Sequence, residues 1–175
     1  MALEHFLSEN KATILERWYR LIRETYPPNT ARFLKREKNR FVNPVGYTIS
    51  QEIGVLYDEL LTGMDLEKLT TSLENIIKIR SVQDFSPSEG VVFIHLLKRT
   101  MREELEGKFS SDRIFEEWAQ LESKIDTLAL LAFDIYMRCR EKIFEIKVRE
   151  VKGERERIFK LLERTRLVSG DQGRE

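Results

Sequence analysis

Apolar residues recur at intervals of three and four positions along almost the whole chain, and this spacing is typical of amphipathic helices. Proline and glycine, which interrupt helices, are few and fall between the apolar runs. The pattern predicts an all-α bundle of about six helices. The predicted helices cover residues 2–26, 30–41, 45–62, 65–82, 86–107 and 113–168, so the C-terminal helix is by far the longest.

Residues at the ends of the predicted helices favour the same division. The first helix ends at Pro27, and the third ends at Gly63, because glycine readily adopts the backbone conformation that follows a helix. The strongest start signal is the Ser-Pro-Ser-Glu motif at 86–89. It offers a capping serine, a proline at the first helical position and a glutamate three residues after the serine. We therefore expect a helix to begin there.

The long last helix carries two apolar patterns. Between Leu128 and Met137 it is apolar on nearly every side, so we expect this part to be the buried centre of the bundle. Farther on, apolar residues recur every seven positions among many charges, which is typical of a helix that packs against a partner helix. Lys147 and Glu154 interrupt the repeat, which predicts a short, weak coiled coil. The predicted partner-contact residues are Phe144, Val148, Val151, Ile158, Leu161, Leu162 and Thr165.

These patterns predict three parts of the chain. Residues 1–146 form a helical sensory or regulatory bundle, and residues 147–168 extend its last helix without a break. Residues 169–175 form a flexible tail, because glycine and polar side chains replace the apolar pattern there.

Composition and charge exclude several classes of protein. Among 175 residues, 30 Lys and Arg balance 30 Asp and Glu, so no net field draws the chain to nucleic acid. The single cysteine, Cys139, cannot form an intramolecular disulfide, and no secretory signal opens the sequence, which favours the cytoplasm. No apolar stretch approaches the ~20 residues that span a bilayer, so we expect no membrane insertion.

The residues that catalysis and metal binding require are scarce. Two histidines and one cysteine cannot assemble a Cys/His zinc site, and they are too few for an ordinary Cys-His or Ser-His-Asp nucleophile. The eight glycines are scattered singly, so the chain has no glycine-rich phosphate loop. We therefore predict no enzyme activity, no metal site and no bound cofactor.

Polar residues gather between the fourth and fifth predicted helices. Arg80, Gln83, Asp84 and Ser86 lie beside a helix N-terminus, where free N–H groups and the helix dipole favour an anion. The segment is a candidate site for a small acidic ligand. The same residues also fit a structural role, in which Asp84 and Ser86 cap the helix and Arg80 pairs with a carboxylate.

Three further residues are candidate ligand contacts. His95 lies in an apolar run and fits either a haem axial ligand or a core histidine with a hydrogen-bond partner. Asp134 interrupts an apolar face, which predicts either an ion pair with Arg138 one turn later or a proton-linked switch. Tyr136 and its neighbour Met137 fit either a packed core or the lining of a cavity for an apolar ligand.

Several motifs of the chain resemble one protein family. They are Tyr26-Pro27-Pro28, Asn43-Pro44-Val45-Gly46, the run from Ile79 to Ser88 and the run from Asp126 to Lys142. These motifs are similar to the N-terminal domain family of the RsbRD-type co-antagonists. In that family the domain precedes a STAS domain in stressosome proteins, which regulate a switch kinase of the general stress response. The likeness covers about residues 10–152.

The resemblance implies both an architecture and a role. Related domains are dimeric, helical and globin-like without haem, and they receive signals that pass along the helix leading to the next domain. No STAS domain follows residue 168 in this sequence, so we expect either a fragment of a longer protein or a stand-alone member.

The residues and the resemblance together favour a non-enzymatic sensory or regulatory domain that forms a homodimer and signals through its C-terminal helix. Two other functions stay open. One is a sensor that binds haem or a small apolar ligand, and the other is a structural adaptor subunit of a respiratory or redox complex. The expected partners are a second copy of the chain, a further protein and a small-molecule ligand.

Overall fold

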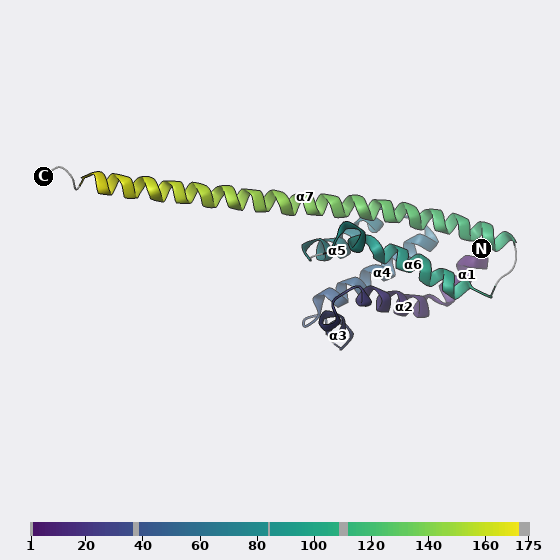
Figure 1. Ribbon diagram of the computed structural model, residues 1–175. Coiled ribbons are helices and arrows are strands. Elements are labelled where there is room, and N and C mark those ends of the chain that lie inside the picture. Colours follow the sequence, from purple (N-terminus) through teal and green to yellow (C-terminus); the bar gives the residue numbers. More distant parts are fainter. Residues whose placement is uncertain (1, 37–38, 84, 109–111, 172–175) are drawn as a thin grey trace. The chain divides into compact units, whose positions relative to one another are not determined.

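The computed structural model describes residues 2–36, 39–83, 85–108 and 112–171, and in the last helix it describes the side chains of residues 114–162. Within these ranges every regular element is a helix, so the predicted all-α class is confirmed. The helices, labelled in Figure 1, are α1 (Ala2–Glu9), α2 (Lys11–Glu24), α3 (Pro28–Arg36), α4 (Pro44–Thr62), α5 (Leu66–Val82), α6 (Pro87–Leu105) and α7 (Asp112–Asp171). The predicted long C-terminal helix is α7, with 60 residues.

The first predicted helix is two helices, which makes seven in the described ranges rather than about six. The interruption is at Asn10, where φ is −94° and ψ is 9°. The Asn10 side-chain Nδ2 donates to the carbonyl oxygen of Phe6 at 2.8 Å, and the same oxygen also accepts from the backbone N–H of Asn10 at 3.1 Å. Apolar spacing does not reveal this break, because Leu7 and Ile14 are buried on either side of it.

Side-chain caps fix the starts of α4 and α6. Asn43 accepts a hydrogen bond from the backbone N–H of Gly46 at 2.8 Å. At α6 the predicted capping box is present, since Ser86 N donates to the Glu89 carboxylate at 2.8 Å and Glu89 N donates to Ser86 Oγ at 3.4 Å. The capping box therefore fixes the start of α6 directly after the polar segment.

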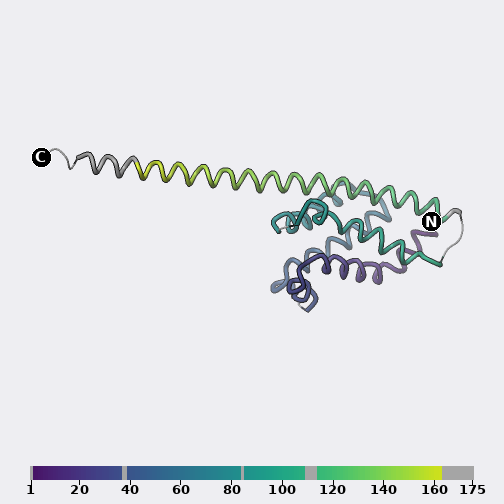
Figure 2. The backbone as a smooth tube through the Cα atoms, in the orientation of Figure 1, coloured from purple at the N-terminus to yellow at the C-terminus, as the bar shows by residue number. Residues whose placement is uncertain are grey.

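The chain divides into two compact units, Met1–Cys139 and Arg140–Glu175. In the first unit, short connections join the successive helices from α1 to α6. Figure 2 shows this path, coloured from purple to teal. The predicted boundary at residue 146 and the predicted flexible tail at 169–175 stay predictions.

Buried side chains hold the helices of the first unit together. The indole N–H of Trp18 on α2 donates to the carbonyl oxygen of Phe93 on α6 at 2.7 Å. The hydroxyl of Tyr57 on α4 donates to the carbonyl oxygen of Leu7 on α1 at 2.8 Å. Both aromatic rings are fully buried, so each contributes apolar burial while its polar atom finds a partner.

Within the first unit, α7 buries one face. The buried residues are Leu121, Ile125, Leu128, Ala132, Ile135 and Tyr136. An ion pair joins this part of α7 to α6, with Lys98 Nζ 2.9 Å from Asp126 Oδ1. On the opposite side Leu130 is 70 % exposed, and Phe133 and Met137 are exposed too. The expectation that this stretch is the buried centre of the bundle is therefore wrong, because apolar composition does not show which faces have a covering element.

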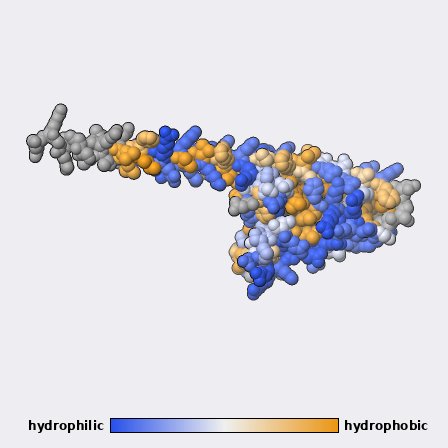
Figure 3. Space-filling view, viewed as in Figure 1, coloured by the Kyte–Doolittle hydropathy of each residue, from blue (hydrophilic) through white to orange (hydrophobic). Residues whose placement is uncertain are grey.

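In the second unit, α7 has no buried side chain among residues 140–162. Its exposed apolar side chains are Phe144, Ile146, Val151, Ile158, Phe159, Leu161 and Leu162. Figure 3 shows apolar groups alternating with charged ones along these residues. Nowhere in the described ranges does a helix combine the length and apolar character that crossing a bilayer requires.

Candidate functional site

Arg80, near the end of α5, is fully buried although its side chain is charged. Its Nε donates to the carbonyl oxygen of Gly90 at 3.1 Å. Its Nη2 donates to the carbonyl oxygen of Glu89 at 2.8 Å and to Thr25 Oγ1 at 3.1 Å. The guanidinium therefore joins α5 to the first turn of α6 and to the C-terminal cap of α2.

Two aromatic rings lie against the same guanidinium. The Arg80 Cζ is 4.2 Å from the ring centroid of Phe85 and 5.2 Å from that of Tyr26. The two rings meet edge to face, with centroids 5.2 Å apart. Aromatic faces attract a cation, and the attraction grows when water is excluded. We call Arg80, Tyr26, Phe85, Gln83 and Gly90 the arginine cluster.

The positive charge of this cluster is desolvated, and the nearby Glu89 carboxylate attracts it without forming an ion pair at contact distance. Burial lowers the pKa of Arg80, because the charged form loses its hydration. Burial also raises the pKa of the Tyr26 hydroxyl, more than the nearby guanidinium lowers it. No described carboxylate forms an ion pair with Arg80, so the pairing considered from the sequence is not seen there. Arginine nevertheless stays protonated.

Three buried polar atoms of the cluster make no well-formed hydrogen bond among the described residues: Arg80 Nη1, Tyr26 Oη and Gln83 Oε1. The Arg80 guanidinium and the Tyr26 hydroxyl lie close enough to attract each other. Tyr26 and Gln83 line a groove of about 510 Å³, and the fully buried Arg80 lies behind its lining residues. Its lining residues are Thr25, Tyr26, Pro27, Thr30, Gln83, Phe85 and Glu89. Buried polar groups normally have a partner, so this concentration of unpaired atoms beside one groove makes it the candidate ligand site.

Tyr136 connects the arginine cluster to α7. Its hydroxyl donates to the carbonyl oxygen of Phe85 at 2.6 Å. Its ring packs so closely on Gly90 that a Cβ at residue 90 would lie 2.3 Å from the ring carbon Cε2. Only glycine permits such an approach. Because Gly90 also accepts the Arg80 hydrogen bond, the cluster touches α7 through two neighbouring contacts.

The remaining candidate residues lie elsewhere. His95 is exposed on α6, so it does not lie in the core. Asp134 is exposed on α7, where water solvates its carboxylate and an ion pair is not needed. Ser86 caps α6, and Asp84 lies outside the described residues. In the described ranges, no group of three or more His, Cys, Asp and Glu is placed to hold a metal ion.

Sequence reasoning found Arg80 and Gln83 but missed Thr25, Tyr26, Phe85 and Gly90. Tyr26 and Phe85 belong to the motifs that carry the family resemblance, and this signal could have identified them. The role of Gly90 depends on its distance to a ring that is far away in the sequence. No local pattern carries that information.

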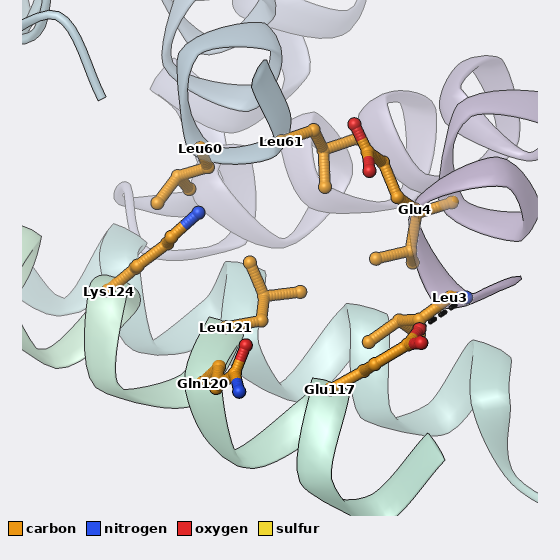
Figure 4. Close-up of a pocket in the computed structure, with 9 residues that line it drawn as sticks. Leu3, Glu4, Leu60, Leu61, Glu117, Gln120, Leu121 and Lys124 are labelled. Atoms are coloured by element: carbon orange, nitrogen blue, oxygen red, sulfur yellow. Dashed lines mark hydrogen bonds between the residues drawn. The ribbon is translucent and has the colours of Figure 1, made fainter. Parts of the chain in front are cut away.

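A second pocket lies between α1, α4 and α7 (Figure 4). Its volume is about 40 Å³, which holds no more than a few water molecules. Leu60 and Leu121 face the space, and the backbone N–H of Leu3 donates to the Glu117 carboxylate at 3.0 Å. The hydrogen bond anchors α1 on α7, so we interpret this pocket as a packing feature.

The predicted partner residues form an exposed apolar surface in the second unit. Phe144 is 68 % exposed and Val151 is 65 % exposed, and Ile158 and Leu161 are similarly open. We call these four residues the α7 stripe. Of the other predicted residues, Leu162 is also exposed and Val148 is half-buried. The side chain of Thr165 lies outside the described residues.

The chain matches a known family over most of its length. The family described as the RsbT co-antagonist protein rsbRD N-terminal domain matches residues 12–151. The chain belongs to this family. The RsbRD N-terminal domains are regulatory and stressosome-related, and the matched range contains the whole arginine cluster and the first two residues of the α7 stripe.

One curated relative of this RsbRD N-terminal domain is an uncharacterized protein from Archaeoglobus fulgidus. The two are 28 % identical over 96 residues, which cover 54 % of this chain and 60 % of the relative. The match therefore spans less than two thirds of the relative's length. No solved structure matches the chain, and the globin-like arrangement stays a prediction.

Proposed function

We propose that this chain is a non-enzymatic regulatory domain that senses a signal in its helical bundle and transmits it, as a cytoplasmic homodimer, through α7. The α7 stripe carries this proposal. Its four apolar side chains are exposed on a stretch of helix that has no buried side chain of its own among residues 140–162. Most helical stability in proteins comes from packing of the apolar face, so we expect a partner helix to pack on this stripe.

A second copy of the chain is the covering helix that fits best. Residues spaced by seven meet their own copies across the axis of a parallel coiled coil. In that arrangement Glu150 and Arg155 occupy the flanking g and e positions, where opposite charges of the two copies approach each other. Lys147 and Glu154 interrupt the apolar positions, so we expect association in the micromolar range rather than a permanent dimer.

The continuity of α7 supports transmission. α7 runs from Asp112 to Asp171, so Tyr136 beside the arginine cluster and the α7 stripe belong to one element. A change in the packing around Tyr136 alters the same helix that carries the proposed dimer contacts. The output is therefore a change in binding between proteins, which needs no catalytic group.

The test is sedimentation equilibrium of the full chain across micromolar concentrations. The wild type should dimerise, and Ile158→Glu should raise the dissociation constant by at least roughly a hundredfold, because two buried isoleucines worth about 1.5–3 kcal/mol each are lost. Lys160→Glu, which places the same side chain off the stripe, should change the constant less than about threefold. A wild type that stays monomeric, or equal effects of both variants, would contradict the proposal.

A further inference from the structure

We propose that the groove beside Arg80 binds a small organic carboxylate, whose oxygens pair with Arg80 Nη1 and Tyr26 Oη. This inference rests on the proposed sensory function and names the class of the signal. Among the described residues, four buried side-chain atoms lack a hydrogen-bond partner. Three of them belong to the arginine cluster, and the fourth is Nε of Arg23.

The charge of the cluster selects an anion. Arg80 is 0 % exposed, and its other donors bind only neutral oxygens, the carbonyls of Gly90 and Glu89 and the hydroxyl of Thr25. A buried charge without an ion pair at contact distance is costly, and a ligand carboxylate at Nη1 offsets part of that cost. The planar guanidinium matches a carboxylate better than it matches a neutral group.

Among the described residues that line the groove, Glu89 is the one with an acidic side chain. Its carboxylate accepts from Ser86 N and from Ser86 Oγ, both at 2.8 Å, so it serves the capping box of α6. The hydrogen bond that it receives from Arg80 goes to its backbone carbonyl. The nearby like charge limits affinity for the ligand, which suits a sensor of an abundant metabolite better than a tight binding protein.

The third unpaired atom narrows the ligand class. Gln83 Oε1 is an acceptor, and it needs a donor that a plain carboxylate lacks. A hydroxyl beside the carboxylate supplies one. A groove of about 510 Å³ has ample room for such a hydroxy acid, with lactate as the smallest simple probe. Propionate has the same carboxylate without the hydroxyl and is the matched comparison.

Binding is coupled to α7 through Phe85. The Phe85 ring lies over the guanidinium, so a ligand that reaches Nη1 displaces this ring. The backbone carbonyl of Phe85 accepts the hydrogen bond of Tyr136 on α7. Displacement of the Phe85 segment therefore alters the contact of α7 with the first unit.

The competing explanation is that Arg80 only clamps three helices. Replacing Arg80 by methionine separates the two explanations, because each oxygen that accepts from Arg80 keeps another hydrogen bond. The carbonyls of Glu89 and Gly90 lie in α6 and accept helical hydrogen bonds, and Thr25 Oγ1 donates to Ile22 O at 2.7 Å. An apolar replacement of a buried charge is often neutral or stabilising. Arg80→Met should therefore keep or raise the melting temperature if Arg80 serves a ligand.

The experiment is thermal unfolding of the full chain in sodium lactate, propionate, phosphate or chloride at equal ionic strength. At about ten times its dissociation constant, lactate should raise the wild-type melting temperature by roughly 3–6 °C. Propionate should give a smaller shift, and phosphate and chloride none. Arg80→Met should abolish the lactate shift, whereas Arg20→Met, at an exposed arginine on α2, should respond like the wild type.

Three results would overturn the inference. The first is the absence of a carboxylate shift in the wild type. The second is a shift with phosphate alone, which makes the carboxylate class wrong. The third is a lactate shift of wild-type size in Arg80→Met, because the ligand then does not bind at Arg80.

The ligand test and the dimer test fail independently. Ile158→Glu should retain the lactate shift, because the groove lies within the first unit. A dimer without a lactate shift contradicts this inference and leaves the proposed function standing. A lactate shift in a chain that stays monomeric supports this inference and contradicts the proposed dimer. A third measurement tests the coupling through Phe85. Hydrogen exchange at residues 133–139 should change with lactate in the wild type but not in Tyr136→Phe. Unchanged exchange in the wild type would contradict the coupling.

Discussion

The two parts of α7 both carry apolar residues at helical spacing, but their surroundings differ. Between Leu121 and Tyr136 apolar residues at helical spacing are buried against the other helices of the first unit. Between 140 and 162 apolar residues at helical spacing are exposed or half-buried. The helical spacing of apolar residues therefore indicates that a helix face packs against another segment, but it does not identify that segment.

The comparison also separates two kinds of functional surface. In the first unit the unusual feature is polar, a buried guanidinium with unpaired neighbours. In the second unit the unusual feature is apolar, a stripe that faces water. Buried polar groups and exposed apolar patches are the two departures from ordinary burial that carry information about function. Here they support the proposed ligand site in one part and the proposed partner contact in the other.

The strongest test of this comparison is a pair of substitutions two residues apart on α7, one on its buried face and one on its exposed face. Leu128 is 1 % exposed and Leu130 is 70 % exposed. Leu128→Asp should lower the free energy of unfolding by more than about 4 kcal/mol, because an unpaired carboxylate replaces a buried apolar group. Leu130→Asp should change it by less than about 0.5 kcal/mol. Urea denaturation of both variants provides the measurement.

The outcome that contradicts the comparison is a large loss for Leu130→Asp in dilute, monomeric protein. Such a loss would mean that another part of the same chain covers this face. A loss that appears only at high protein concentration has the opposite meaning, because it places Leu130 in a contact between copies.

Much of the fold was predictable from the sequence, because helix ends are encoded locally. The capping box at 86–89 and the helix break at Gly63 depend on residues within one or two turns. The break at Asn10 was missed although it is also local, because it is a small change of backbone angle at a residue that fits equally well on a helix surface. The burial of α7 was misjudged for another reason, since burial depends on helices distant in the sequence.

The candidate site was only half predictable. Arg80 and Gln83 were expected as polar residues near a helix N-terminus, which is a local property. Arg80 is fully buried and stacked on two rings, and both properties depend on how α2, α5 and α6 come together. His95 shows the converse, because its apolar sequence neighbours did not make it a core residue.

Two glycines provide a second contrast, with a smaller expected effect. Gly90→Ala should destabilise the first unit by about 1–3 kcal/mol, because its Cβ would lie 2.3 Å from the Tyr136 ring. At Gly153, in the second unit, a new Cβ would meet no neighbouring atom within 4 Å among the described residues. Gly153→Ala should therefore stabilise the helix by up to about 1 kcal/mol. Hydrogen exchange of the full chain can measure both changes.

The double variant Gly90→Ala with Tyr136→Leu is the control for the first glycine. It should recover part of the stability, because the smaller side chain makes room for the new Cβ. Destabilisation by Gly153→Ala would contradict the contrast, since it would show that a neighbouring segment already occupies the space beside that residue.

The smallest expected effect is pH-dependent and concerns the cap of α6. Hydrogen bonds from the backbone and side chain of Ser86 hold the pKa of Glu89 below its usual value of 4.5. A carboxylate whose pKa is lowered by folding contributes stability above the unfolded pKa and loses it as the pH falls through the folded pKa. Glu89→Gln should therefore melt slightly below the wild type at neutral pH, and the two melting temperatures should converge in acid.

Glu145→Gln is the matched variant in the second unit, where an exposed pair with Arg149 at 3.6 Å contributes little. If Glu145→Gln shows an equal pH-dependent difference, then the cap beside the arginine cluster is no better ordered than an exposed surface pair.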